Sequence, residues 1–222
     1  MKKEAKRAAT LVLVKDSDEG LQTLLLRRHK QLKVGSGSWV FPGGAIDPED
    51  GLLGEQEQHT AMVAALRETQ EEAGLDVPLA GLQFLSHWTT PSGYPFRFAT
   101  WFFVTEGSDA PVKVDGEEMD DFLWASPAHF LRCHEARQML MLPPTVVTLC
   151  ELAACENVAA VRAFYANREA PFIEPVKANN PALTCMMYPG DAGFESADDS
   201  LPGPKNRCYL DNDVWRYVCG PE

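Results

Sequence analysis

Short runs of hydrophobic residues, separated by turn-forming residues, dominate the first two thirds of the chain. Residues 8–14 and 21–28 are apolar, and the acidic stretch at 16–20 that divides them ends in a glycine. This pattern predicts two strands joined by a short turn. Residues 96–105 carry large side chains at both sets of alternating positions, which predicts a strand covered on both faces. Apolar runs predict further strands at residues 39–41 and 82–90, and residues 117–124 are expected to add another.

Helical spacing marks two longer stretches. Residues 59–73 repeat apolar or small side chains every three or four positions, which predicts a helix with one inward face, and Gly74 ends it. The residues of this face are Met62, Leu66, Thr69 and Ala73. Residues 143–166 begin with two prolines and predict another helix, while Ser126-Pro127 indicates the start of a short one. Strands and helices in this order predict an α/β (α+β) fold with a mixed sheet between helices.

The composition changes after residue 170. Residues 171–222 contain seven prolines and four glycines, and the hydrophobic periodicity is lost. The same segment carries too many large apolar side chains for a disordered tail. We therefore expect a main domain at residues 1–170 and an extended C-terminal arm at 171–222, packed on that domain or on a partner subunit.

Composition and charge narrow the class of protein. The chain has 222 residues of which 45% are hydrophobic, enough for a full core. The net charge of −12 argues against nucleic-acid binding but allows a phosphorylated small molecule accompanied by a divalent cation. The absence of an apolar run of 18 residues and of a signal-peptide pattern predicts a cytoplasmic protein with no membrane partner. Six scattered cysteines without a Cys-x-x-Cys pair are expected to be reduced thiols.

The most informative residues are three glutamates near the end of the first predicted helix. Glu68, Glu71 and Glu72 occupy positions i, i+3 and i+4, so they lie on one helical face within one turn. Like charges repel in this arrangement and add nothing to helix stability. Converging carboxylate oxygens are the ligands that Mg²⁺ or Mn²⁺ requires. A solvated acidic helix end is the alternative.

A glycine-rich segment precedes this helix. The apolar residues 39–41 run into Pro42-Gly43-Gly44, where the backbone can turn sharply and approach a ligand closely. Together with Arg-Glu-Thr-Gln-Glu-Glu-Ala-Gly-Leu at residues 67–75, this segment resembles the Nudix box. The only departure in the second half of the box is Thr69, which fills an apolar position. Members of that family hydrolyse nucleoside diphosphates linked to another moiety.

The first half of the box departs from the family pattern. The interval from Gly44 to Arg67 is nine residues longer than in the family, and the extra residues fall at about 51–58. We expect a loop there, which leaves the helix intact. Asp47 and Asp50 are the candidates for the first carboxylate of the box, and two glutamates of the insertion are the alternative. These are Glu55 and Glu57.

The resemblance implies a Nudix-type α/β/α sandwich and a set of roles. It implies Mg²⁺ or Mn²⁺ bound by the three helix glutamates beside Gly44, with Glu68 and Glu72 as direct ligands and Glu71 sharing the metal or orienting water. The family often takes a late carboxylate as a further ligand or base, and Glu118 is the first choice, with a solvated loop residue as the alternative. Arg67 is expected to act by pairing with Glu71 at i+4 rather than by touching substrate.

Two arginines lie at a predicted strand end close to the glycine segment. Arg27 and Arg28 could bind a diphosphate through bidentate hydrogen bonds. Because neighbouring strand residues point to opposite faces, at least one of them is expected to be an ordinary solvated charge. The five histidines share no ligand spacing, so none is assigned to metal.

The resemblance also bears on the substrate. Residues 91–103, residues 142–145 and the lengthened box loop are similar to the Nudix branch that contains peroxisomal coenzyme A diphosphatases and bacterial relatives. That similarity implies hydrolysis of coenzyme A or acyl-CoA, although Gly37-Ser38-Trp39-Val40 stands where a better-defined subgroup has Gly-Gln-Val. ADP-ribose, NADH or dinucleoside polyphosphates remain alternatives, as does a non-catalytic ligand-binding regulator. A homodimer is also left open.

Overall fold

One mixed β-sheet forms the centre of the molecule in the computed structural model, which describes residues 4–51 and 56–221. Its main path runs in the order β3-β2-β1-β6-β5-β8, with β4 paired to β1 and β7 paired to β2. The strands of this sheet within those residues are β1 (Lys6–Ser17), β2 (Gly20–Arg28), β3 (Trp39–Val40), β4 (Gly43–Ala45), β5 (Gln83–Thr89), β6 (Phe98–Glu106), β7 (Met119–Ala125) and β8 (Phe172–Ile173).

The long strand β1 organises this sheet. One of its edges pairs in parallel with β6 over residues 6–14. Its other edge is shared, because β4 pairs with residues 8–10 and β2 pairs with residues 14–17, both antiparallel. The strands β4 and β2 therefore pair with successive parts of the same edge of β1.

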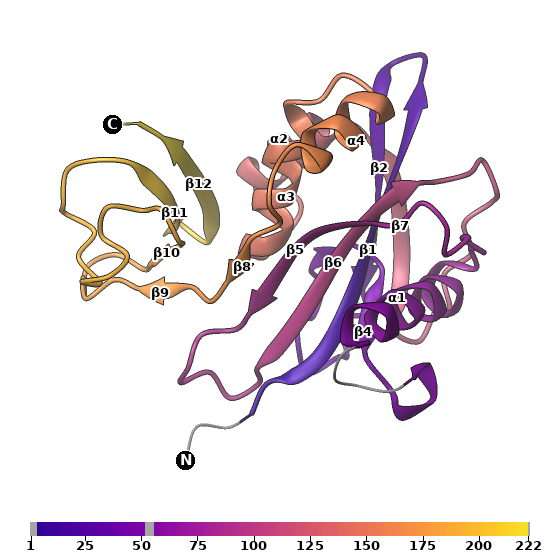
Figure 1. Ribbon diagram of the computed structural model, residues 1–222, viewed down its shortest axis with the longest axis horizontal. Coiled ribbons are helices and arrows are strands. Elements are labelled where there is room, and N and C mark those ends of the chain that lie inside the picture. Colours follow the sequence, from indigo (N-terminus) through magenta and orange to yellow (C-terminus); the bar gives the residue numbers. More distant parts are fainter. Residues whose placement is uncertain (1–3, 52–55, 222) are drawn as a thin grey trace.

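Helices cover both faces of the sheet (Figure 1). The helix α1 (Glu57–Ala73) covers one face, and α2 (Pro127–Glu135), α3 (Pro143–Ala153) and α4 (Val158–Ala166) cover the other. The side chains of β1 alternate accordingly, since Leu11 and Leu13 pack in the core beneath α1, whereas Val12 and Val14 pack in the core beneath the other three helices. The expected α/β/α sandwich with a mixed sheet is confirmed.

The helix α1 lies close to the sheet because its inward face is built from small residues. Ala61, Ala64 and Ala65 are fully buried, while Met62 and Leu66 lie at the side of the helix and are partly buried. Thr69 stands where the Nudix pattern has an apolar residue and is also fully buried; its hydroxyl donates a hydrogen bond of 2.7 Å to the carbonyl of Ala65. Gly74 ends the helix in the left-handed conformation, as the sequence predicts.

The single helix predicted for residues 143–166 is wrong. The chain forms α3 and α4 there, bent by 111° at a short break, and the side chain of Asn157 caps α4 by accepting a hydrogen bond from the N–H of Ala160. No single helix in the described part of the chain is long and apolar enough to cross a membrane; only α3 and α4 taken together across the bend meet the length and composition required.

The C-terminal segment is not the extended arm expected from its composition. After β8 joins the main sheet, the chain forms a second, four-stranded antiparallel sheet in the order β12-β11-β10-β9. Its strands are β9 (Val176–Lys177), β10 (Cys185–Met187), β11 (Lys205–Asp211) and β12 (Val214–Gly220). A buried ion pair joins Arg207 to Asp191 at 2.6 Å. All six cysteines are free thiols.

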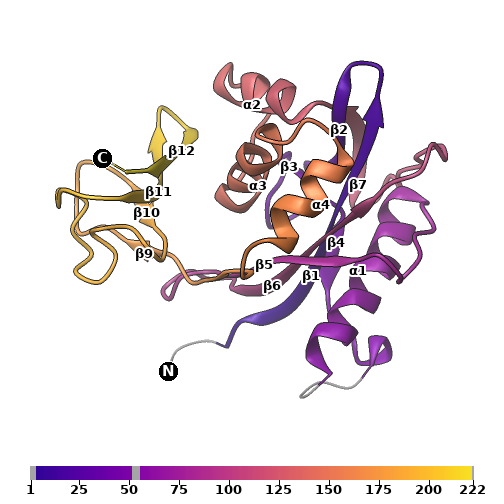
Figure 2. The same cartoon turned by 45° about the horizontal axis from the view of Figure 1, so that its top comes forward.

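This second sheet packs beside α2 and α3, on the side of the molecule away from α1 (Figure 2). The ring of Tyr188 lies 5.2 Å from that of Trp88 in β5. The buried ring of His134 in α2 bridges the two parts, because Nδ1 donates to the carbonyl of Met139 at 2.9 Å and Nε2 accepts from the N–H of Trp215 at 3.2 Å. The C-terminal segment thus packs on the main domain of its own chain.

Candidate active site

Gly43 and Gly44 bring the backbone of β4 directly beneath α1. The sequence predicts a turn here, but the two residues form a strand opposite Thr10 and Ala9 of β1. A Cβ atom on Gly43, whose φ is 155°, would overlap the carbonyl of Ala9, and a Cβ on Gly44 would overlap the carboxylate of Glu68. The two glycines are needed because strand and helix approach so closely.

Glu72 is the most deeply buried acidic group of the helix, with only 2% of the residue exposed. Its Oε2 accepts a hydrogen bond of 2.8 Å from the N–H of Gly43, while its Oε1 is buried without a hydrogen-bond partner among the residues that the structure describes. Burial, assisted by the charge of Glu68, raises the pKa of this carboxyl group to about 8 against the opposing effects of the Gly43 N–H and the charge of Arg28. A buried oxygen without a partner is a ready acceptor for a cation.

Glu68 lies beside Glu72 on the same side of the helix. Burial raises the pKa of Glu68, and its hydrogen bond from Arg67 only partly offsets this. The charge of Glu118 raises the pKa of both Glu68 and Glu72, so the three carboxylates share one electrostatic environment. Glu118 lies just before β7 with 58% of its side chain exposed. The charge of Glu118 thus acts on two of the predicted helix glutamates, Glu68 and Glu72.

Arg67 uses every one of its N–H groups within the protein. Nε and Nη2 bind the carboxylate of Asp50 at 2.8 and 2.9 Å, and Nη2 also binds the carbonyl of Ala45 at 3.0 Å. Nη1 donates to Glu68 at 3.0 Å and to Glu71 at 2.9 Å, so the predicted i+4 pair is present. A guanidinium has five donors, and none is left for a substrate. Arg67 holds β4 and the turn after it against α1.

Asp47 and Asp50, the two candidates for the first carboxylate of the box, both lie at Arg67. Asp50 ends a short 3₁₀ helix, η1 (Pro48–Asp50), and the hydrogen bond from Arg67 is the largest influence that lowers the pKa of its buried carboxyl group. Asp47 lies 3.7 Å from Arg67 and is mostly exposed. Both aspartates therefore face Arg67 rather than Glu72. Glu57 begins α1 and pairs with Arg7 at 3.3 Å, and Glu55 lies outside the described residues.

Glu71 differs from the other two helix glutamates. Its side chain is 53% exposed and turned toward Arg67. In the part of the chain that is described, no three histidine, cysteine or acidic side chains gather closely enough to enclose a metal ion. The unpartnered Oε1 of Glu72 beside the half-buried Glu68 nevertheless offers hard oxygen donors of the kind that Mg²⁺ and Mn²⁺ prefer. The residues present fit a divalent cation.

The two arginines at the end of β2 contact different residues. Arg27 binds Asp120 at 2.6 Å and Asp121 at 3.3 Å, and the first of these hydrogen bonds is the main reason that its pKa is raised. Arg28 points to the face that carries the glutamates, where its Nη2 lies 4.0 Å from Glu118 and its charge acts on Glu72. Of the two arginines, it is Arg28 that lies beside Glu118 and acts on Glu72.

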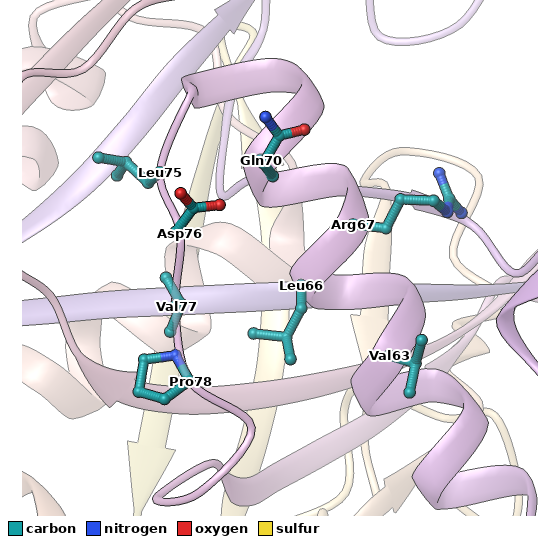
Figure 3. A pocket seen from close by; sticks show the side chains of 8 residues that line it. All are labelled: Val63, Leu66, Arg67, Gln70, Leu75, Asp76, Val77 and Pro78. Carbon is teal, nitrogen blue, oxygen red and sulfur yellow. The ribbon is translucent and has the colours of Figure 1, made fainter.

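A shallow groove of about 590 Å³ lies on the outer flank of α1, between this helix and the segment that follows it (Figure 3). In the close-up, Leu66 faces Val77 and Pro78 across the groove, and the guanidinium of Arg67 points away from it. Neither Glu68 nor Glu72 lines this groove. It lies next to the candidate site, and Arg67 borders both.

A sequence model of the NUDIX domain matches residues 5–142. A Caenorhabditis elegans protein named as a nudix hydrolase is 25% identical over 86% of this chain and 75% of its own length. A Bos taurus m7GpppN-mRNA hydrolase is 26% identical over 52% of this chain, which spans 40% of the bovine protein. The crystal structure of a NUDIX hydrolase from Alicyclobacillus acidocaldarius superposes with a TM-score of 0.66 at 25% identity, covering 72% of this chain and 96% of that one.

The chain therefore belongs to the Nudix family and is a Nudix hydrolase, a pyrophosphohydrolase by class. Hydrolases of this family act on nucleoside diphosphate derivatives and generally use divalent cations. The resemblance of the glycine segment and the glutamate helix to the Nudix box is confirmed at the level of the family.

Proposed function

We propose that this Nudix hydrolase uses Mg²⁺ or Mn²⁺ to cleave the diphosphate of a nucleoside diphosphate derivative, with coenzyme A and acyl-CoA as the first substrates to test. The observation that carries the proposal is Glu72, whose buried Oε1 has no hydrogen-bond partner within residues 4–51 and 56–221, while Oε2 is fixed by Gly43. A carboxylate held in this way is costly without a cation and well placed with one. Glu68 supplies the second carboxylate, and Gly44 leaves room for it.

Each residue of the proposed site has a separate role in the reaction. A bound divalent cation would offset charge on the diphosphate and lower the pKa of water. Arg28 would hold the diphosphate oxygens, because its guanidinium faces the acidic residues and is not saturated by a carboxylate partner in the way that Arg27 is. Glu118 would accept the proton of the attacking water. Attack at phosphorus breaks one P–O bond and releases two monophosphates.

Glu118 is a better candidate for the base than Glu71. Glu118 is exposed, and its charge acts on both Glu68 and Glu72. Glu71 is bound by Arg67 at 2.9 Å, so its carboxylate is turned toward that guanidinium. Glu71 would then act mainly by keeping Arg67 in place, and Arg67 by keeping the helix and β4 in place.

The substrate proposal rests on similarity outside the glutamate helix. Residues 91–103 and 142–145 resemble the coenzyme A diphosphatase branch, and the loop within the box is lengthened. With coenzyme A the products would be an adenosine bisphosphate and phosphopantetheine. The bovine m7GpppN-mRNA hydrolase makes capped nucleotides a second class to test, since this chain resembles part of that protein. ADP-ribose, NADH and dinucleoside polyphosphates complete the set.

The experiment is a panel of these diphosphates with Mg²⁺ or Mn²⁺ and identification of both products. The proposal expects metal-dependent hydrolysis of at least one compound, with coenzyme A or an acyl-CoA preferred by kcat/KM. Glu72→Gln should abolish it, whereas Glu57→Gln, on the same helix but paired with Arg7, should not. Binding of a compound without cleavage would support the non-catalytic regulator instead, and preference for another compound would replace coenzyme A.

A further inference from the structure

The turn that carries Glu118 is organised by one side chain. Oδ1 of Asp115 accepts hydrogen bonds from three successive backbone N–H groups, those of Glu117 at 2.9 Å, Glu118 at 3.0 Å and Met119 at 2.9 Å. Gly116 takes a φ of 77°, which lets the chain reverse, and its N–H binds the carbonyl of Met119 at 2.9 Å. A carboxylate that accepts several backbone N–H groups fixes the conformation of a turn.

The turn is attached to the rest of the site at both ends. Before it, the N–H of Lys113 donates to the carbonyl of Ala73, the last residue of α1, at 2.8 Å. After it, the N–H of His29 donates to the carbonyl of Glu118 at 2.7 Å, and Met119 is fully buried beneath α1. The backbone of Glu118 is therefore fixed between the end of α1 and the end of β2.

We propose that Asp115 is a positioning residue of this hydrolase, which holds the backbone of Glu118 so that its carboxylate faces the metal-binding glutamates and Arg28. The inference rests on the proposed role of Glu118. The side chain of Glu118 has no hydrogen bond of its own among the described residues, and its contact with Arg28 is a 4.0 Å ion pair. The position of the Glu118 carboxylate consequently depends on how firmly the backbone of this residue is held.

The variants follow from the hydrogen bonds. Asp115→Ala removes the acceptor of three N–H groups, whereas Asp115→Asn removes the charge but keeps an oxygen that can accept the same bonds. Misplacement of a catalytic group by about 1 Å can cost a factor of about 100 in rate. We expect Asp115→Ala to lower kcat by about tenfold or more with KM nearly unchanged, and Asp115→Asn to stay within about threefold of the original protein.

A comparison with Glu118→Gln separates positioning from a general structural role. If Asp115 acts through Glu118, adding Asp115→Ala to Glu118→Gln should cause no further loss of kcat. Amide hydrogen exchange at residues 117–119 should become faster in Asp115→Ala. Asp198→Ala is the matched control, because Asp198 also accepts the N–H of Ser200, at 3.0 Å, in the distant C-terminal segment. That control should leave kcat and the exchange rates unchanged.

Three outcomes would overturn the inference. An equal loss of kcat from Asp115→Ala with and without Glu118→Gln would show that Asp115 acts independently of Glu118. A loss in Asp115→Asn as large as in Asp115→Ala would show that its charge matters rather than its hydrogen bonds. Full activity in Glu118→Gln would refute both the role of Glu118 as the base and the role of Asp115 as its positioning residue. It would not refute the hydrolase activity itself. By contrast, failure of the unsubstituted protein to cleave any of the diphosphates would refute the proposed function as a whole.

Discussion

Replacing Glu72 with glutamine should stabilise the metal-free protein while destroying its activity. Glutamine has nearly the size of glutamate, and its side-chain oxygen can still accept the N–H of Gly43. The buried Oε1 position, which lacks a partner, becomes an uncharged amide group. The variant therefore resembles a Glu72 that stays protonated at every pH.

The size of the effect follows from the pKa. Burial raises the pKa of Glu72 from 4.5 to about 8, so the folded protein binds a proton that the unfolded chain releases above pH 4.5. Stability associated with this group is complete below pH 4.5 and is lost as the pH rises toward 8. Linkage gives a loss of about 1 kcal/mol at pH 5 and about 3 kcal/mol at pH 7. Glutamine avoids that loss, so the free energy of unfolding of the variant should exceed that of the original protein by these amounts.

The assay is urea unfolding in EDTA at pH 4, 5 and 7, followed by fluorescence. The two proteins should be nearly equal at pH 4 and diverge steadily toward pH 7. Saturating Mg²⁺ should then stabilise the original protein more than the variant. A difference in unfolding free energy that does not change with pH would refute the assignment of a raised pKa. Turnover within about tenfold of the original protein in saturating Mg²⁺ would refute Glu72 as a metal ligand.

Three further predictions concern the surrounding residues. Gly44→Ala should weaken Mg²⁺ affinity by about tenfold or more, measured by titration calorimetry, because its Cβ would displace Glu68; unchanged affinity would contradict the close approach. Arg67→Lys should lower the unfolding free energy by about 2 kcal/mol, since lysine cannot replace both bonds to the buried Asp50, and an unchanged urea midpoint would count against this. Arg28→Met should raise KM by about tenfold while Arg27→Met leaves KM unchanged, because Arg28 lies beside Glu118 whereas Arg27 is paired with Asp120; equal KM values for the two variants in steady-state kinetics would contradict this division.

The sequence predicts the glutamate helix well because its signal is local. Spacing of three and four residues fixes one face of a helix whatever surrounds it, and Gly74 supplies the stop. The separation of Glu71 from Glu68 and Glu72 is not local. It depends on Arg67 being held by Asp50, a residue 17 positions earlier on the far side of a lengthened loop. Spacing alone places all three carboxylates together.

The structure also differs from the sequence-based predictions where elements are short or where contacts with neighbouring elements determine the conformation. Strands of two or three residues, such as β9 and β10, leave too few positions for alternation to be visible. The sequence of the C-terminal sheet therefore predicts an extended arm. The break between α3 and α4 does carry a local signal, because Asn157 is a favourable N-cap, but two apolar helices in succession hide it. Asp115 is marked only by the glycine that follows it, a common turn signal.

The placement of β8 has a consequence for how the chain can be divided. Phe172 and Ile173 pair with His87 and Trp88, so the outer edge of β5 is closed by residues that come after α2, α3 and α4. A protein shortened at residue 170 would leave that edge without a partner and would uncover the rings of Phe84 and His87, which Phe172 contacts. Exposed strand edges flanked by apolar side chains promote association between chains. The shortened hydrolase should therefore aggregate, and the two sheets should unfold in one cooperative step.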